Sequence, residues 1–367
     1  MGPTIAKKLF AAALIFYAAC GQPEVDSFDA WRGAETIFNS EVINSHVVNA
    51  AYANAPYANA PYANAAYANA GYANAAYANM PFFMGVDYAG VTIGSAPVGG
   101  MSISNGQLRG VRQTDGAALT GAAFIGASLT GRMSNYASFA MKVDNIVNDA
   151  AFGVNWYYVS ISLDSGSTWV PFCQGGVGAL ALQYRWSGTN AKVLDGRMFT
   201  FACDNAALAK CVKWGYDPQK TKQERLNSST ARAQSLADWH QACIRMVTAD
   251  YCGDGVAHTR TGASIDIYDN LNIQLRAGTL RGTEADWATD GARCIRKTRW
   301  VNSTGLGDDL AYVNSHCPQR LAVNNPFGCG GDPNKRPDVS NYPTSNGYYV
   351  PSGYRNLLRN DSYGFLP

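Results

Sequence analysis

Nine cysteines constrain the folding of this chain of 367 residues more strongly than any other feature. One of them, Cys20, lies near the N-terminus, and the other eight lie from residue 173 onward. An even set of cysteines in an exported chain predicts disulfides that staple the fold. We expect all eight to be paired: Cys173, Cys203, Cys211, Cys243, Cys252, Cys294, Cys317 and Cys329.

The order of the cysteines leaves their connectivity open, and proximity along the chain is the guide that the sequence offers. Zinc bound by thiolates is the rival use of cysteine, but no two cysteines have the C-x-x-C spacing typical of such sites. Disulfides are therefore favoured over zinc. We expect three local pairs and one long-range pair: Cys203–Cys211, Cys243–Cys252, Cys317–Cys329 and Cys173–Cys294.

The N-terminal residues account for the ninth cysteine. Lys7 and Lys8 precede an apolar run from Leu9 to Tyr17, which is too short to span a bilayer as a mature helix. Two alanines then precede Cys20, an arrangement that resembles the lipobox of bacterial lipoproteins. The resemblance implies a signal peptide over residues 1–19 and a lipid on Cys20 after cleavage.

Residues 20–34 are polar enough to serve as a tether between that lipid and the fold. Gly21, rather than an aspartate, follows the cysteine, and by resemblance to Gram-negative sorting this favours the outer membrane. The membrane is thus an expected partner, through the anchor on Cys20. The alternative is an ordinary signal peptide cleaved near Ala19, which would release a secreted protein.

A five-residue repeat begins at Glu35. Asparagine recurs at every fifth position from 39 to 79, with a large apolar residue two positions before it. Residues 117–131 follow the same pattern with glycine in place of asparagine, and both residues adopt left-handed backbone at low cost. Both blocks resemble pentapeptide-repeat proteins, which implies a β-helix-like region over residues 35–131 with an irregular insert. The alternative for residues 50–80 is a disordered low-complexity segment.

Alternating apolar residues predict an antiparallel β region after residue 132. Residues 155–163 are aromatic and β-branched and end at the turn 164–166, which predicts a hairpin with residues 167–173. Further strands are expected over 137–143, 179–186, 198–203 and 265–269.

Two helices are expected among these strands. Asp204 or Asn205 could cap a short helix that ends at Cys211. Apolar residues at three- and four-residue spacing predict a longer helix over about 229–247. The expected fold class is therefore α+β, mainly antiparallel β with one longer helix, stapled by disulfides. Residues 301–367 are expected to form a cysteine-stapled and partly irregular tail.

The densest motif lies between Ser235 and Asp269. Its centre, Ala249-Asp250-Tyr251-Cys252, resembles the signature of the ADYC domain, and further similar segments flank it at 210–218, 284–287 and 290–294. That domain belongs to uncharacterised bacterial proteins, many of them myxobacterial lipoproteins. The resemblance implies an ADYC-like domain over residues 132–300 and implies no activity.

Two chemical uses of the signature remain open from the sequence. Imidazoles and carboxylates suit zinc or acid–base catalysis, and carboxylates alone suit calcium, although the spacing of an EF-hand is missing. The candidate residues for a metal or catalytic site are His240, His258, Asp250 and Asp254. The candidate calcium ligands are Asp250, Asp254, Asp266 and Asp269.

A third interpretation of the signature is structural. Asp250 would accept hydrogen bonds from backbone amides and from Arg245 or Arg260, while Tyr251 packs and Cys252 forms a disulfide. Gly253 and Gly255 would then form the turn. We favour this interpretation, because dense cysteine, glycine and aspartate motifs in exported proteins usually staple a fold.

The remaining sequence features narrow the function only broadly. A net charge of +2 with 15% charged residues does not indicate a nucleic-acid partner. We expect a cell-envelope lipoprotein with a non-catalytic role in surface display, adhesion or contact with a protein or glycan ligand, through exposed aromatic residues. The alternative is a secreted enzyme or metal-binding protein that uses His240, His258, Asp250 and Asp254. The sequence identifies no cofactor.

Overall fold

The computed structural model describes residues 46–49, 83–162, 164–204, 206–225, 231–259, 263–276, 282–299, 309–324 and 356–362. The expected signal peptide (1–19), the lipidation site Cys20 and the tether (20–34) lie outside these residues. So do Cys329, Arg260 and most of the repeats between 35 and 82. The predictions for these segments therefore stay predictions.

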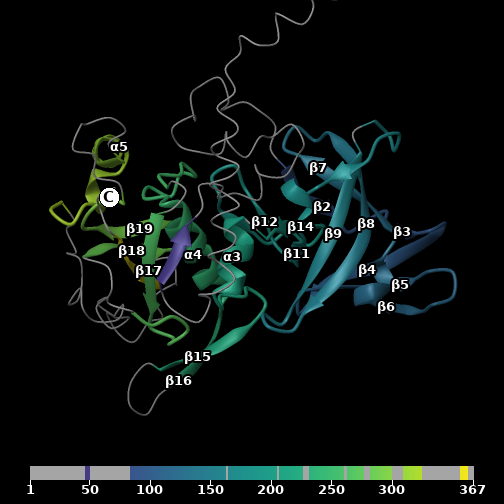
Figure 1. Cartoon of the computed structure of the whole chain (residues 1–367), viewed down its shortest axis with the longest axis horizontal. Coiled ribbons are helices and arrows are strands. Elements are labelled where there is room, and N and C mark those ends of the chain that lie inside the picture. The colour runs from purple at the N-terminus through teal and green to yellow at the C-terminus, as the bar shows by residue number, and fades with distance from the viewer. Residues whose placement is uncertain are drawn as a thin grey trace, which may run out of the picture.

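A large antiparallel sheet occupies one side of the molecule (Figure 1). Its eleven described strands follow the order β10-β9-β11-β14-β2-β7-β3-β4-β5-β6, with β8 between β7 and β9. The strands are β2 (Phe83–Asp87), β3 (Thr92–Ile93), β4 (Ala96–Ser104), β5 (Gln107–Arg112), β6 (Ala118–Thr120), β7 (Ala127–Met133), β8 (Ser138–Asp149), β9 (Val154–Ser162), β10 (Val170–Pro171), β11 (Ala179–Leu182) and β14 (Met198–Cys203).

Alternation along these strands builds the first part of the core. In β8 the buried side chains Phe139, Met141 and Val143 alternate with more exposed neighbours, as expected for a sheet with one solvated face. Aromatic rings fill the space beneath, where Phe83 meets Phe172 with ring centroids 5.2 Å apart. The predicted strands at 137–143, 155–163 and 198–203 are thus confirmed as β8, β9 and β14.

The second block of pentads does not form a β-helix. Residues 117–131 contribute β6, a 3₁₀ turn (η3, Gly121–Phe124) and β7, and both strands pair antiparallel with neighbours in the large sheet. The small–large alternation predicted inward-facing side chains, and the alternation of an antiparallel strand satisfies it equally well. The prediction of a repeat coil is therefore wrong for these residues.

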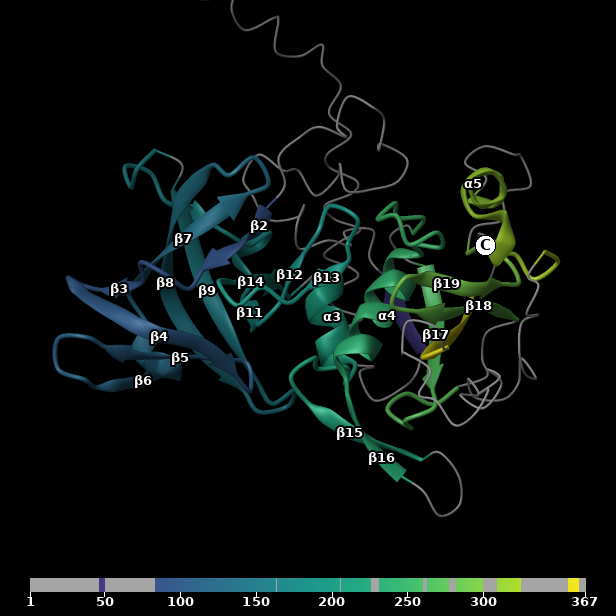
Figure 2. The ribbon, with the colours of Figure 1, turned by 180° about the vertical axis from the view of Figure 1, so that it is seen from behind.

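A second sheet lies on the other side of the molecule, beside helix α4 (Figures 1 and 2). Its order is β1-β17-β20-β18-β19, and all pairs are antiparallel. The strands are β1 (His46–Asn49), β17 (Ala263–Asp269), β18 (Thr283–Ala288), β19 (Gly291–Ile295) and β20 (Leu358–Ser362).

Strand β20 shows that the expectation for the C-terminal tail was partly wrong. The sequence predicted a partly irregular tail for 301–367, yet Leu358–Ser362 is buried and lies between β17 and β18, in the middle of the sheet. Its charged side chains concealed this position, because Arg359 and Asp361 are typical of surfaces. Both are instead buried and paired, Arg359 with the buried Asp286 and Asp361 with the partly exposed Arg276.

Three helices are described, and α4 (Ala237–Thr248) connects the two sheets. It packs against β18, β19 and β20 on one side and against α3 (Ala207–Lys213) on the other, and α3 packs on β14. The third helix, α5 (Asp309–His316), lies near the end of β19 (Figure 1).

The helix predictions need two corrections. The predicted helix 229–247 begins later, because residues 231–235 form β16 (Ala231–Ser235), which pairs with β15 (Thr221–Arg225) in a hairpin that projects from the body (Figure 2). Asp204 does not cap α3: its carboxylate pairs with Lys213, and no side chain bonds the N-cap position. Asn205 lies outside the described residues.

All four expected disulfide pairs are wrong. The disulfides are Cys173–Cys203, Cys211–Cys243 and Cys252–Cys317, and Cys294 is disulfide-bonded as well. Proximity along the chain failed as a guide to the pairing because the C-terminal part of α4 separates Cys243 from Cys252. Cys243 faces α3, whereas Cys252 lies beyond the end of the helix. Each bond joins two elements of the fold instead of closing a short loop.

Candidate functional site

The signature begins where helix α4 ends. Ala249 adopts the left-handed conformation (φ 52°, ψ 40°). The amide of Asp250 donates to the carbonyl of Arg245 at 2.8 Å, and the amide of Ala249 donates to that of Met246 at 3.0 Å. These bonds form a Schellman motif. A left-handed alanine costs about 1–2 kcal/mol, and burial of its methyl group offsets part of that cost.

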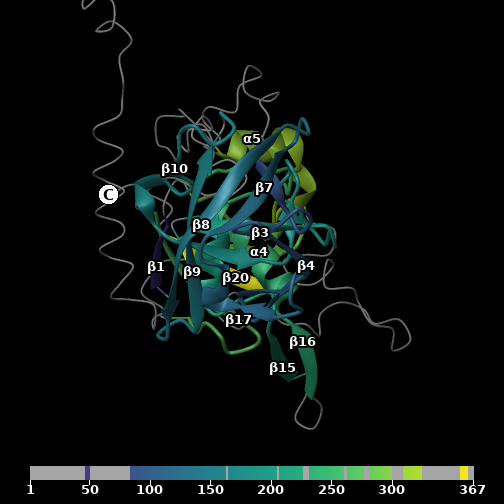
Figure 3. The same ribbon diagram turned by 90° about the vertical axis from the view of Figure 1, so that its right-hand side faces the viewer.

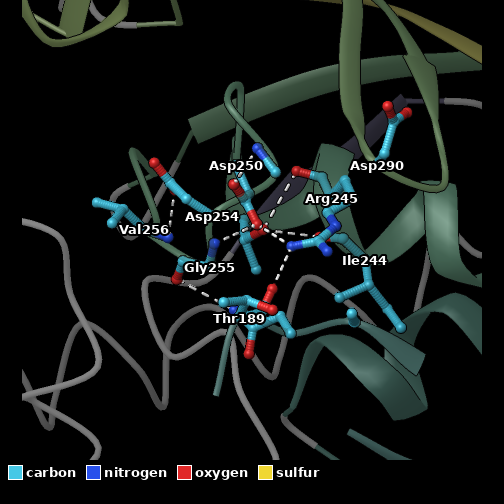
Figure 4. Close-up of polar contacts among 12 residues, drawn as sticks. Thr189, Ile244, Arg245, Asp250, Asp254, Gly255, Val256 and Asp290 are labelled. Atoms are coloured by element: carbon cyan, nitrogen blue, oxygen red, sulfur yellow. Dashed lines mark hydrogen bonds and ion pairs between the residues drawn. The ribbon is translucent and has the colours of Figure 1, made fainter. Parts of the chain in front are cut away.

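The carboxylate of Asp250 is buried and holds three donors (Figure 4). Arg245 forms an ion pair with Oδ2, the amide of Gly255 donates to the same oxygen at 3.0 Å, and the amide of Gly253 donates to Oδ1 at 2.8 Å. Burial raises the pKa of this carboxyl above its ordinary value, and Arg245 and the Gly255 amide offset only part of that increase. Both carboxylate oxygens are thus engaged within the turn, as the structural interpretation expected.

Arg245 also joins two turns outside the signature to this hydrogen-bond network. Its Nη1 donates to the carbonyl of Thr189 at 2.6 Å, in the turn between β12 (Arg185–Trp186) and β13 (Lys192–Val193). Its Nε donates to the carbonyl of Thr289 at 3.2 Å, in the turn between β18 and β19. One buried guanidinium therefore holds three chain segments together.

Gly253 permits the close approach on which this turn depends. Its φ of +75° favours glycine, and a Cβ atom there would lie 1.8 Å from the carbonyl oxygen of Asp290. Backbone cannot yield as a flexible side chain can, so no other residue fits without moving the β18–β19 turn.

Tyr251 anchors the signature to the second sheet. Its ring stacks on Trp287 with centroids 5.4 Å apart, and its hydroxyl donates to Glu284 at 3.1 Å. Burial, and then the charge of Glu284, raise the pKa of Tyr251 far above its ordinary value.

Arg299 completes this buried network. It binds both oxygens of Glu284, at 3.0 and 2.9 Å. It also donates to the carbonyls of Met246 and Val247 at 2.7 and 3.0 Å, so a cation satisfies the C-terminal end of α4.

Three contacts hold helix α5 against the signature. Cys252 forms the disulfide to Cys317, just after the helix. The hydroxyl of Tyr312 donates to Asp254 at 2.8 Å. Nδ1 of His258 lies 3.1 Å from Oδ1 of Asp309, and the ring of His258 lies between Tyr251 and Tyr312.

His240 serves a different part of the fold. It lies on α4, roughly 12 Å along the helix from its last residue. Its Nε2 lies 2.9 Å from the carbonyl of Leu208 in α3, and its ring packs edge-on against Trp186. Burial lowers its pKa to about 3. His240 is therefore a neutral core residue near neutral pH.

The sequence-nominated ligands thus fall into separate groups. Asp250 bonds within the signature turn, His258 contacts α5, and His240 contacts α3. Of the calcium candidates, Asp269 binds Tyr216 at 2.7 Å and the amide of Gln274 at 2.7 Å, in the turn after β17. Within the described ranges, no three histidine, cysteine, aspartate or glutamate residues form a group suited to a metal ion.

Sequence reasoning missed the charged residues of the second sheet. Glu284 and Asp286 alternate with Ala285 and Trp287, a pattern that usually indicates one solvated face, yet all are buried. Their partners, such as Arg299 and Arg359, are distant along the chain. The surplus of charge in a β-prone segment was the available signal.

The family comparison agrees with the geometry. The family model of the ADYC domain matches residues 121–301, which include the signature and its partners Glu284 and Arg299. No curated protein and no solved structure matches the chain. Strand β2, which precedes the match, lies between β14 and β7, and β20, which follows it, lies between β17 and β18. The chain therefore contains an ADYC domain over residues 121–301, and its two sheets extend beyond that domain at both ends.

Proposed function

We propose that this chain is an exported binding protein, anchored to the outer membrane through a lipid on Cys20, in which the ADYC signature maintains the fold rather than performing catalysis. One observation carries the proposal: both oxygens of the buried Asp250 carboxylate accept hydrogen bonds from within the signature turn and α4, from Arg245 and two backbone amides. A catalytic carboxylate needs an oxygen within reach of the proton it moves, and this one faces its own turn.

The cysteines support the location. Three disulfides join described elements, as is typical of proteins from oxidising compartments. None of the helices in the described ranges has the length and apolar character needed to cross a membrane. In the proposal, the signal peptide 1–19 and the lipid on Cys20 supply the attachment.

Exposed aromatic residues support a binding role. Tyr136 is 80% exposed and Trp169 is 37% exposed, and both lie in connections at one end of the large sheet. Large rigid aromatics contribute much of the free energy of binding in interfaces. We propose them as the contact residues for a protein or glycan ligand.

A binding assay on Gram-negative envelopes tests this function. Labelled processed protein, lacking residues 1–19, is added to outer-membrane vesicles from cells without the protein. The proposal predicts saturable binding that unlabelled protein competes away and that protease or glycosidase treatment of the vesicles reduces. Binding that never saturates, or that every treatment leaves unchanged, would count against a specific ligand.

A second candidate function is a metal-binding protein or enzyme centred on His258. Among the described residues, Nε2 of His258 and Oδ2 of Asp309 are buried without a hydrogen-bond partner. A histidine oriented by a carboxylate and open at its other nitrogen suits a metal ion or a proton transfer. In this candidate, Asp254 lies nearby through Tyr312, whereas Asp250 and His240 are already bonded elsewhere.

The metal content of the protein, purified without chelator, tests the second candidate. Stoichiometric metal that disappears in His258→Ala but remains in His240→Ala would support it and displace the first proposal. Protein without bound metal in both variants and in the wild type would reject a metal-binding role.

A further inference from the structure

One face of the large sheet is polar and uncovered in the described structure. Along β7 and β8, every second side chain points into the core, Leu129 and Met141 among them. The side chains that alternate with these in each strand point outward. Figure 3 views the molecule from the side on which β7, β8 and β9 lie. The outward side chains, here named the polar sheet face, are Ser128, Thr130, Arg132, Ser138, Lys142 and Ser160.

Charges on the polar sheet face are balanced. Lys142 pairs with Asp144 at 2.9 Å, and Arg132 pairs with Asp87 at 2.6 Å. A face that attracted phosphate or another anion would hold cations without such partners. The polar sheet face therefore fits a neutral ligand that forms hydrogen bonds with hydroxyl groups.

A rigid loop places Trp169 at this face. Asp164 accepts from the hydroxyl of Ser162 at 2.7 Å and from the amide of Thr168 at 2.8 Å, and these bonds lower its pKa to about 2. The amide of Gly166 donates to the same serine hydroxyl at 2.7 Å. The ammonium of Lys142 lies 5.0 Å from the centroid of the Trp169 ring. The loop holds the indole in place before any ligand arrives, which lowers the entropic cost of binding.

Tyr136 is the second exposed aromatic and has a strained backbone. It lies in the β7–β8 turn with φ of +66°, a conformation that favours glycine. Its side chain is 80% exposed, so packing does not explain a tyrosine there. Strain without a packing benefit indicates a role in contact with something outside the fold.

The two aromatics lie at the same end of the sheet. Arg132 pairs with Ser138 beside the turn that carries Tyr136, and Ser162 pairs with Ala140 before the loop that carries Trp169. Lys142, next to the indole, is four residues from Ser138, or roughly 13 Å along the strand. Between these two positions the outward side chains of β8 and β7 are Ala140 and its partner Thr130.

We propose that the polar sheet face binds a neutral, linear oligosaccharide, with sugar rings stacked on Trp169 and Tyr136. The electron-rich face of an aromatic ring attracts the weakly positive C–H groups of a sugar, and Ser128 and Thr130 supply hydrogen bonds to its hydroxyl groups. A protein ligand would need a contiguous apolar centre, whereas these rings are isolated among polar groups. This assignment rests on the proposed binding function and names its ligand class.

Calorimetric titration of the processed full chain with cellohexaose and with chitohexaose tests the assignment. We expect saturable binding of at least one hexasaccharide and weaker binding of the matching disaccharide. Trp169→Ala should weaken binding at least tenfold. Tyr136→Gly should weaken it similarly while the melting temperature stays equal or rises, because glycine relieves the strained turn. Leu194→Ala, which removes an exposed apolar side chain away from this face, should change nothing.

Two results would overturn the assignment. One is the lack of saturable binding to either hexasaccharide, and the other is binding that Trp169→Ala and Tyr136→Gly leave unchanged. If vesicle binding stays saturable in either case, the glycan assignment fails and the general binding function stands. If the wild type also fails to bind the vesicles saturably, the glycan assignment and the general binding function both fail.

Discussion

At the scale of single residues, each residue of the signature makes a different contact that holds the turn in place. Ala249 turns the chain at the end of α4, and Asp250 accepts from three donors. Tyr251 packs against the second sheet, and Cys252 forms the disulfide with Cys317, just after α5. Gly253 then passes the β18–β19 turn without a side chain. The motif is a junction of chain segments.

Gly253→Ala separates steric fit from backbone strain. Gly94 has a similar φ of +59° but open space around the position of a Cβ atom. Gly94→Ala should therefore cost only about 1 kcal/mol, for the left-handed backbone. Gly253→Ala should cost about 1–3 kcal/mol more, for the contact with Asp290. Urea unfolding of both variants measures the difference, and equal losses would show that the close approach does not constrain the fold.

His240 makes stability depend on pH. Its folded-state pKa of about 3 lies below the ordinary 6.5, so between these values the unfolded chain binds a proton that the folded chain does not. The contribution of the neutral, buried His240 to the free energy of unfolding is therefore complete above pH 6.5. Below that pH the free energy of unfolding falls by up to about 1.4 kcal/mol per pH unit. Urea unfolding at pH 7 and pH 5 should show a smaller difference for His240→Gln than for the wild type. An identical difference would mean that His240 is not responsible.

At the scale of elements, the Cys252–Cys317 disulfide attaches a helix that packs weakly by itself. Helix α5 has one buried residue, Val313, and its described attachments to the signature are the Cys252–Cys317 bond, two polar contacts and the ring contact of Tyr312 with His258. Helix α4, in contrast, is buried along almost its whole length.

Replacing Cys252 and Cys317 together by serine should therefore loosen α5 alone. We expect a loss of about 2–4 kcal/mol in stability and faster amide exchange over residues 309–317, with α4 still protected. Hydrogen exchange measured by mass spectrometry checks this. Replacing Cys211 and Cys243 is the comparison, because it should loosen α3 and α4. Uniform loss of protection in the first variant would contradict a local role for the bond.

At the scale of the whole molecule, the domain matched by the family is smaller than the folding unit. The large sheet needs β2 between β14 and β7, and the second sheet needs β20 between β17 and β18. Both strands lie outside residues 121–301. The ADYC domain of this chain thus depends on segments before and after it.

A fragment of residues 121–301 should consequently fail to fold. It would leave edges unpaired in both sheets and would expose buried partners of β20 such as Asp286. A fragment of residues 83–362 should unfold cooperatively, because it retains β2 and β20. Near-ultraviolet circular dichroism during urea unfolding distinguishes the two. Cooperative unfolding of the shorter fragment would refute the claim.

The sequence predicted the local pattern better than the long-range contacts. Alternation located β8, β9 and β14, and the structural interpretation of the motif expected that Asp250 would accept from backbone amides and from Arg245 or Arg260, of which Arg245 is the partner. The disulfide pairing and the place of β20 depend on which segments meet in space. Local pattern does not contain that information, and buried charges such as Arg359 and Asp361 resemble surface residues until their partners are known.

The central claim, that the signature maintains the fold, is tested most directly by Asp250→Asn. Asparagine keeps the shape but removes the charge that Arg245 needs, and breaking a buried ion pair costs about 3–5 kcal/mol. Asp115→Asn removes the partner of Arg112 in an exposed pair and should leave stability almost unchanged. Urea unfolding of the full chain should show the large loss for Asp250→Asn alone. A variant as stable as the wild type would contradict the account and return Asp250 to the candidates for catalysis.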